Sequence, residues 1–196
     1  MGRILDLSER IILVLLFIAL LSANLRSGHP ANLLLVATEF MSVFFVLIRR
    51  RALSVSTHAV DWGLALGGTM LPLMVRPGGE PLVIDAVSAT LMSAGALVAL
   101  AAKLSLNRRF GLAPANRGVQ RAWAYSIVRH PMYAGYIVVQ FGFILANPTP
   151  RNLAIYAIAW SVQVARIVRE ERWLMSDPDY QAYAATVRFR LVPGVF

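Results

Sequence analysis

Long, continuous runs of apolar residues dominate this chain, and short polar segments separate them. Six runs stand out, at residues 11–25, 31–48, 59–75, 82–104, 132–146 and 151–168. Most come close to the roughly 20 residues that a helix needs to cross a bilayer, and in lipid such runs satisfy their backbone polar groups only as helices. Alternating strands of about ten residues, typical of a membrane barrel, are not visible. The pattern therefore predicts an all-α, polytopic membrane helical bundle with five to six transmembrane helices.

The polar segments divide the chain into three parts. We expect about four membrane helices in residues 1–104, a cytosolic connector in residues 105–131, and a C-terminal helical hairpin, tail and cofactor pocket in residues 132–196. The hairpin should turn tightly, through Asn147, Pro148, Thr149, Pro150 and Arg151. The first apolar run has the flanks of a signal peptide, but no clear cleavage site follows it. Because a multi-span chain normally keeps its first helix, we expect this segment to remain.

Composition favours the bilayer as the solvent. Of 196 residues, 58% are hydrophobic and 15% are charged, whereas a soluble domain of this size exposes more charge. The net charge of +9 lies in short clusters between the apolar runs, which argues against nucleic acid as a partner. The absence of cysteine excludes disulfides, thiolate metal sites and a cysteine nucleophile. No metal site is predicted.

Positive charge predicts the orientation, because cytoplasmic loops retain Lys and Arg. With a cytosolic N-terminus, all but three of the 19 Lys and Arg residues fall on the cytosolic side, the exceptions being Arg26, Arg76 and Arg151. We assign the cluster from Arg49 to Arg51 to this topological role. Both termini and the active site are therefore expected at the cytosolic face.

The segment from Arg129 to Tyr136, at the start of the fifth apolar run, carries the first candidate chemistry. Pro131 suits the first turn of a helix and keeps the preceding residue out of helical conformation. This places His130 at the N-terminal end of the helix, immediately before its first turn. The N–H groups and positive dipole of that helix end can bind an anion, such as the carboxylate of an amino-acid-like cofactor. Without the neighbouring motifs, His130 would be only an interfacial capping residue.

Two faces of the fifth helix carry different signals. Tyr133, Tyr136 and Gln140 share one face by their i, i+3 and i+7 spacing, which gives a polar, aromatic stripe. This stripe either lines a pocket or belongs to an interfacial belt of aromatic residues. Gly135 and Gly142 predict another face, where a neighbouring backbone approaches closely.

The segment from Arg169 to Leu174, at the end of the sixth run, carries two adjacent carboxylates, Glu170 and Glu171. From their angular spacing, one should point along the hairpin toward the first motif and the other elsewhere. Acids oppose the macrodipole at a helix C-terminus, so they need a cationic ligand or arginines such as Arg166 and Arg129. The alternative is a solvated pair that balances nearby arginines.

Three residues are candidates for substrate binding. Glu39 is the only acid deep in an apolar run, where a charge is expensive and indicates function; its alternative is a neutral or hydrogen-bonded carboxyl group. Trp173 and Tyr183 lie near the predicted cytosolic boundary. The basic, aromatic tail that contains Tyr183, Arg188 and Arg190 either lies at the interface or folds back as a lid over the site.

Three motifs follow one another around the hairpin: Arg129-His130-Pro131-Met132-Tyr133-Ala134-Gly135, then Glu170-Glu171-x-x-Leu174, then Tyr180-x-x-Tyr183 leading to Arg190-x-x-Pro193. Together they resemble the isoprenylcysteine carboxyl methyltransferase family and its phospholipid methyltransferase relatives, over about the last third of the chain. The resemblance implies S-adenosylmethionine at the cytosolic end of the hairpin and a lipophilic or prenylated substrate that arrives from the bilayer. It implies cofactor-binding positions at His130, Tyr133, Gly135, Glu170 and Glu171. Further candidates for this pocket are Pro131, Tyr136 and Gln140.

The acceptor decides which residues are catalytic. A carboxylate is ionised at neutral pH, needs no general base and is held by an arginine fork. The candidates for that fork are Arg190, then Arg188 and Arg129. An amine acceptor would need a base, for which His130 or Glu170 would serve, as in a phospholipid-type N-methyltransferase. We expect methyl-ester formation by a monomer among membrane lipids.

A small transporter or channel is the non-enzymatic alternative, with Glu39 and other polar residues between helices as its path. Against it, no internal repeat and no paired broken helices are visible, and the polar residues gather at one end. A membrane reductase that uses NADPH is a further alternative, although the chain has no dinucleotide-binding glycine motif.

Overall fold

The computed structural model describes residues 2–27, 32–50, 52, 54–111 and 114–196. In these ranges the helices are α1 (Gly2–Ser27), α2 (Asn32–Ile48), α3 (Ala59–Met70), α4 (Asp85–Leu106), α5 (Pro131–Ala146), α6 (Pro150–Leu174) and α7 (Pro178–Thr186). Short 3-10 turns are η1 (Leu71–Met74), η2 (Asn107–Arg109) and η3 (Trp123–Ser126). Two-residue strands, β1 (Ser54–Val55) and β2 (Ala115–Asn116), form an antiparallel ribbon.

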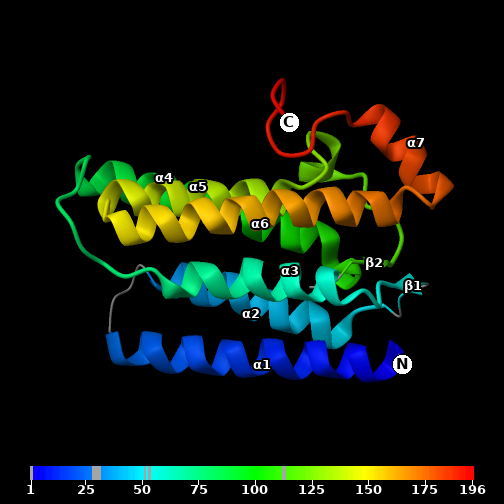
Figure 1. The fold of residues 1–196 in the computed structure, drawn as a ribbon, viewed down its shortest axis with the longest axis horizontal. Coiled ribbons are helices and arrows are strands. Elements are labelled where there is room, and N and C mark those ends of the chain that lie inside the picture. Colours follow the sequence, from blue (N-terminus) through cyan, green and yellow to red (C-terminus); the bar gives the residue numbers. More distant parts are fainter. Residues whose placement is uncertain (1, 28–31, 51, 53, 112–113) are drawn as a thin grey trace.

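Each of the six predicted apolar runs contains an α-helix, which confirms the all-α class. The helices α1 to α6 lie side by side along one direction, with α7 and the tail at one end (Figure 1). Contacts join α1 to α2, α2 to α4, α3 to α6 and α4 to α5. The helix α6 continues to Leu174, beyond the predicted end at residue 168, and extends past the start of α5 (Figure 1).

One helix among the described residues, Asp85–Arg109, is long and apolar enough to cross a membrane by length and composition. A second apolar helix, Pro131–Ala146, is shorter. These findings support membrane association weakly, and the polytopic arrangement stays a prediction at this point.

The helices α4 and α5 approach so closely that only glycine fits at their contact. A Cβ atom on Gly135 would lie 2.6 Å from both the backbone nitrogen of Ala99 and the backbone oxygen of Gly95. A Cβ atom on Gly142 would lie 2.9 Å from the side chain of Met92. The predicted close-approach face is therefore confirmed. Because α4 precedes the connector and α5 follows it, the connector joins parts that pack directly against each other.

Arg49, which we assigned to a topological cluster, is buried and paired. Its side chain and that of Glu9 are each 1% exposed, and Arg49 Nη1 lies 2.7 Å from Glu9 Oε1. This ion pair ties α1 to the segment after α2, because a buried charge needs a partner. Arg51 lies outside the described residues. Glu39 lies in α2, but its side chain is outside the described part of the structure.

The end of the bundle where α5 turns into α6 is the hairpin end (residues 74–79 and 145–152). Its turn is tight, as predicted. Asn152 is fully buried and donates to the backbone oxygens of Arg76 at 2.8 Å and Asn147 at 2.9 Å. It also accepts from the Arg76 N–H at 3.1 Å. One neutral amide thus fastens the loop after α3 to the hairpin turn.

Candidate functional site

The start of α5 is held by the last residues of the chain. Pro131 is the first residue of α5, and His130 before it has φ −128° and ψ 58°, outside the helical region as expected for a residue that precedes proline. The N–H groups of Arg129 and His130 donate to the backbone oxygens of Phe189 at 2.9 Å and Arg190 at 2.8 Å. The tail therefore folds back onto the first motif, which is one of the two arrangements that the sequence allowed.

Glu171 gathers polar groups from three parts of the chain. Its Oε1 lies 3.1 Å from His130 Nε2 and 2.9 Å from Arg129 Nε, and its Oε2 accepts a hydrogen bond from Arg190 Nε at 2.7 Å. The residue is 3% exposed, and a carboxylate so buried stays ionised only with partners of this kind. One side chain thus ties together α6, the start of α5 and the tail.

Glu170 also contacts the first motif. The Tyr133 hydroxyl donates to Glu170 Oε2 at 3.1 Å, and the Tyr133 ring stacks on His130 with ring centroids 5.6 Å apart. The guanidinium carbon of Arg166 lies 5.1 Å from the centroid of the Tyr133 ring, a cation–π distance. The prediction that one of the two carboxylates points away from the first motif is therefore wrong. Because the tail returns to α6, it supplies Arg190 to the second carboxylate.

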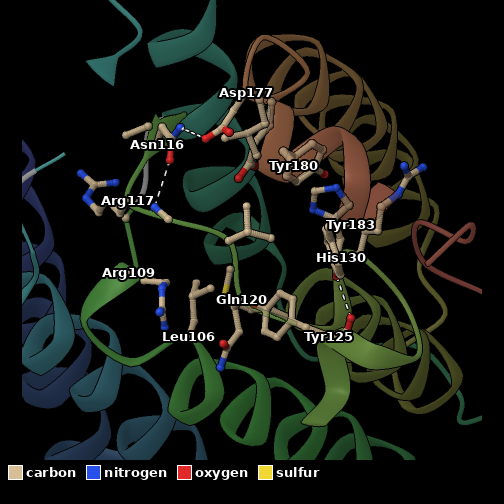
Figure 2. Close-up of a pocket in the computed structure, with 18 of the residues that line it drawn as sticks. Leu106, Arg109, Asn116, Arg117, Gln120, Tyr125, His130, Asp177, Tyr180 and Tyr183 are labelled. Atoms are coloured by element: carbon tan, nitrogen blue, oxygen red, sulfur yellow. Dashed lines mark hydrogen bonds between the residues drawn. The ribbon is translucent and has the colours of Figure 1, made fainter. Parts of the chain in front are cut away.

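A cavity of about 820 Å³, open solvent at its mouth included, adjoins these contacts (Figure 2). The part of it that water-sized molecules can occupy is about 100 Å³, smaller than the roughly 300–1,000 Å³ of most small-molecule sites, so a larger ligand would extend into the open mouth of the cavity. The first motif lines it with Arg129, His130 and Tyr133, and α6 lines it with Glu170. Two motifs on opposite arms of the hairpin therefore border one cavity. We call this region the cavity end (residues 105–111, 114–133 and 170–190).

Aromatic residues form a second wall of the cavity. Tyr125 comes from the connector, and Tyr180 and Tyr183 come from α7 (Figure 2). The Tyr183 hydroxyl donates to the backbone oxygen of Tyr125 at 2.7 Å. Asp177, which caps α7, accepts a hydrogen bond from the side-chain amide of Asn116 in β2. These bonds fasten α7 to the connector and close one side of the cavity.

The connector forms a third wall, and sequence reasoning missed it. Arg109, Asn116, Arg117 and Gln120 all line the cavity. The only signal in the sequence was the length and polarity of the segment between two apolar runs. No spacing within that segment indicated which side chains turn inward.

Several predicted cofactor-binding residues of α5 lie outside the cavity wall. Gly135 faces α4, as described above. The Tyr136 ring lies below the ammonium group of Lys103, which is 5.2 Å from the ring centroid. Gln140 accepts a hydrogen bond from Trp160 Nε1 at 2.7 Å. Of the predicted polar stripe, only its first member, Tyr133, reaches the cavity.

The remaining candidates occupy the margin of the site. Pro131 starts α5 without lining the cavity, and Trp173 lies edge-on to His58 with ring centroids 6.5 Å apart. Arg188 is exposed. Arg190 contacts Glu171 from outside the cavity wall, as given above. The structure therefore brings together the core of each motif and leaves its flanking members at other contacts.

Burial and partners set the charge state of the cavity end. Burial raises the pKa of Glu171, but the hydrogen bond and charge of His130 and the nearby Arg190 and Arg129 lower it more, so this pKa lies below its ordinary value. Burial raises the pKa of Tyr183 to about 12. At neutral pH the site thus combines an ionised carboxylate with a neutral tyrosine hydroxyl.

No protein-family model and no curated protein matches this chain. Among the side chains that the structure describes, no group of three or more His, Asp or Glu residues is placed to hold a metal ion. The cavity instead offers a carboxylate for a cationic group, aromatic faces, and arginines for an anion. A small ligand that carries both charges can use all three.

Proposed function

We propose that this chain is an integral membrane methyltransferase that uses S-adenosylmethionine to methylate the carboxylate of an isoprenylcysteine-like or other lipophilic substrate. The observation that carries the proposal is the meeting of His130, Tyr133 and Glu170 at one cavity, with Glu171 in contact with His130 beside it. These residues belong to two motifs on the two arms of the hairpin, and the family resemblance assigns both motifs to one cofactor. Side chains at opposite ends of the bundle would have removed the physical basis of that resemblance.

The lining of the cavity suits this cofactor. Glu170 provides a carboxylate for a cationic group, and Tyr133, Tyr180 and Tyr183 provide aromatic faces for a nucleobase or a sulfonium. When bound, the cofactor supplies an electrophilic methyl group. The chain then has to orient the two reactants and exclude water, which is the main requirement of an in-line displacement.

The arginines around Glu171 suit a carboxylate acceptor. Such an acceptor is ionised at neutral pH, so it attacks without a general base. Arg190 uses its Nε for Glu171 and its side chain is 35% exposed, which leaves its terminal N–H groups for the acceptor. Arg129 is held at the same carboxylate and is a positioning residue in this scheme.

We also propose that α1 to α6 cross the bilayer, with the cavity end and both termini in the cytosol. Large apolar side chains are exposed on all six of these helices, among them Ile11, Leu15, Ile18, Phe40, Phe44, Leu47, Val60, Leu97, Leu104, Phe141, Leu153, Ile158 and Val164. In water such a surface would be unfavourable, whereas lipid tails cover it. The distribution of Lys and Arg supports this orientation.

A methyl-transfer assay with the purified protein in lipid nanodiscs tests the proposal. Methyl-labelled S-adenosylmethionine and an N-acylated S-prenylcysteine should give a labelled lipid whose label is released by mild alkali, as from a methyl ester. A label that resists alkali would replace the carboxylate acceptor with an amine. If calorimetry shows no binding of S-adenosylhomocysteine, the methyltransferase proposal fails and the transporter becomes the better explanation.

Two tyrosines on the hairpin helices provide a matched pair of variants. Tyr133→Phe removes the hydroxyl that donates to Glu170, whereas Tyr156→Phe removes a hydroxyl without a hydrogen bond among the described residues. The affinity for S-adenosylhomocysteine should fall about 5-fold for Tyr133→Phe, since one hydrogen bond contributes about 1 kcal/mol. It should not change for Tyr156→Phe. Equal affinities of the two variants would reduce Tyr133 to a packing residue.

A further inference from the structure

The connector wall of the cavity carries an arginine that no acid among the described residues balances. Arg109, at the end of η2, lines the cavity, and its Nε is buried without a hydrogen-bond partner among the described residues. Figure 2 shows its side chain on the side of the cavity opposite His130 and Tyr180. A buried donor without an acceptor is unfavourable, so a ligand that accepts from it gains affinity.

Three arginines on or beside α6 differ, because each of them already has an acid. Arg129 and Arg190 lie 2.9 Å and 2.7 Å from Glu171 oxygens. Arg169 pairs with Asp61 at the start of α3. These cations hold the carboxyl end of α6 in place, whereas Arg109 makes no ion pair within the described part of the chain.

Two glycines shape the connector around its arginines. Gly118 has φ +89°, a conformation that glycine adopts readily, and a Cβ atom there would lie 3.6 Å from Arg109 Nε. A Cβ atom on Gly111 would collide with the guanidinium of Arg117, which also lines the cavity. Gly111 therefore lets the Arg117 guanidinium lie against the connector backbone, and Arg109 Nε lies near the backbone at Gly118, which keeps positive charge at this wall.

We propose that Arg109, with Arg117 beside it, forms an anion subsite that binds a carboxylate in the cavity. The inference rests on the proposed function, in which two carboxylates enter the site, one on the amino-acid part of the cofactor and one on the acceptor. Arg190 lies outside the cavity wall and suits the acceptor, so the subsite takes the cofactor carboxylate. Glu170, on the α6 wall, is then left for the positive part of the same ligand.

Calorimetry with two ligands isolates this contact. The ligands are S-adenosylhomocysteine and its decarboxylated analogue, which keeps the ammonium group. Arg109→Gln should lower the affinity for S-adenosylhomocysteine by about 10- to 100-fold. It should change the affinity for the decarboxylated analogue by less than about 2-fold, because that ligand has already lost the interacting group. Arg109→Lys, which keeps the charge but loses the fork, should lie between.

The matched control is Arg172→Gln, which removes the same charge from an exposed position of α6 outside the cavity wall. It should change neither affinity. Equal losses for both ligands in Arg109→Gln would mean that Arg109 only shapes the cavity, and would overturn the inference. Unchanged affinities together with an unchanged KM for the acceptor would overturn it as well.

One further outcome retains the subsite and changes the source of its carboxylate. If S-adenosylhomocysteine binds Arg109→Gln normally while the KM for the acceptor rises by about 10-fold or more, the subsite binds the acceptor carboxylate. Failure of the proposed function gives a different result, because the unsubstituted protein would then bind neither ligand.

Discussion

The two ends of the helical bundle both bury polar side chains, but they use them differently. At the hairpin end the groups are neutral amides that bond to backbone atoms: the buried Asn152 bonds to the backbone of Arg76, and the half-buried Asn147 accepts at Oδ1 from the Gly78 N–H at 2.9 Å. At the cavity end the buried groups are charged and bond to one another around Glu171. Only the charged cluster adjoins the cavity described above.

This difference is the one expected between a polar cluster that fixes a turn and one that binds a ligand. Amides that bond to the backbone satisfy their donors and acceptors while they fix a turn. Buried ion pairs add little stability relative to apolar packing, so a group of them around a cavity needs another reason. Ligand binding is such a reason, which is why we propose the cavity end as the site of the chemistry.

Glu171→Gln should give the largest effect, because it removes the anion shared by Arg129, His130 and Arg190. The Arg129 side chain is 6% exposed and would keep its charge without a buried partner. We expect the free energy of unfolding to fall by about 3–5 kcal/mol. Methyl transfer should fall by about 100-fold or more, because the arginine that binds the acceptor loses its orientation. Initial rates and denaturant unfolding in nanodiscs measure the two effects.

The control for this prediction is Glu80→Gln, an exposed glutamate in the loop between α3 and α4. It makes the same chemical change away from the cavity and should leave both rate and stability unchanged. A Glu171→Gln protein that melts normally and keeps its rate would remove the distinction between the two ends.

Low pH should abolish the same contribution without a mutation. The pKa of Glu171 is lower in the folded protein than its ordinary value, so the unfolded chain binds a proton first as the pH falls. The stabilisation is complete above the ordinary glutamate pKa and is lost as the pH falls through the lowered value. The difference in melting temperature between the wild type and Glu171→Gln, recorded from neutral to acidic pH, should therefore shrink. A constant difference would mean that Glu171 is not ionised in the folded protein.

Asn152→Ala tests the hairpin end, where the expected effect is smaller and purely structural. The substitution leaves the N–H and the oxygen of Arg76 without their side-chain partner, which costs about 1–3 kcal/mol of stability. The affinity for S-adenosylhomocysteine should stay within about 2-fold of the wild type, because the ends are separate sites. Ser161→Ala, at an exposed position of α6, is the control for both measurements. A large loss of affinity in Asn152→Ala would show that the ends are coupled.

Local signals explain what could be predicted from the sequence. Apolar runs predicted the six helices, and the proline at residue 131 predicted both the start of α5 and the non-helical backbone of His130. The spacing of Gly135 and Gly142 predicted a close helix contact, although not that α4 would be the partner. Each of these signals depends on a few neighbouring residues.

The remaining features depend on which distant segments meet. Glu171 gains Arg190, in addition to Arg129 of the first motif, only because the tail returns to α6, and no periodicity in the tail indicates that return. The pair of Glu9 and Arg49 likewise requires α1 to pack on α2. Arg109 turns into the cavity because of the connector backbone, for which the sequence offers no regular pattern.

Tyr183→Phe should give the smallest effect. It tests whether the attachment of α7 to the connector contributes to binding at the cavity end. The variant loses the bond from the Tyr183 hydroxyl to the backbone oxygen of Tyr125, which should cost about 1 kcal/mol of stability. Tyr180→Phe is the control, since Tyr180 lines the same cavity without a hydroxyl bond among the described residues. We expect Tyr183→Phe to lower the melting temperature and raise the KM for the cofactor, because α7 then closes the cavity less often. If Tyr180→Phe has the same effect, the aromatic wall works by packing alone, and α7 need not be fastened to the connector for binding.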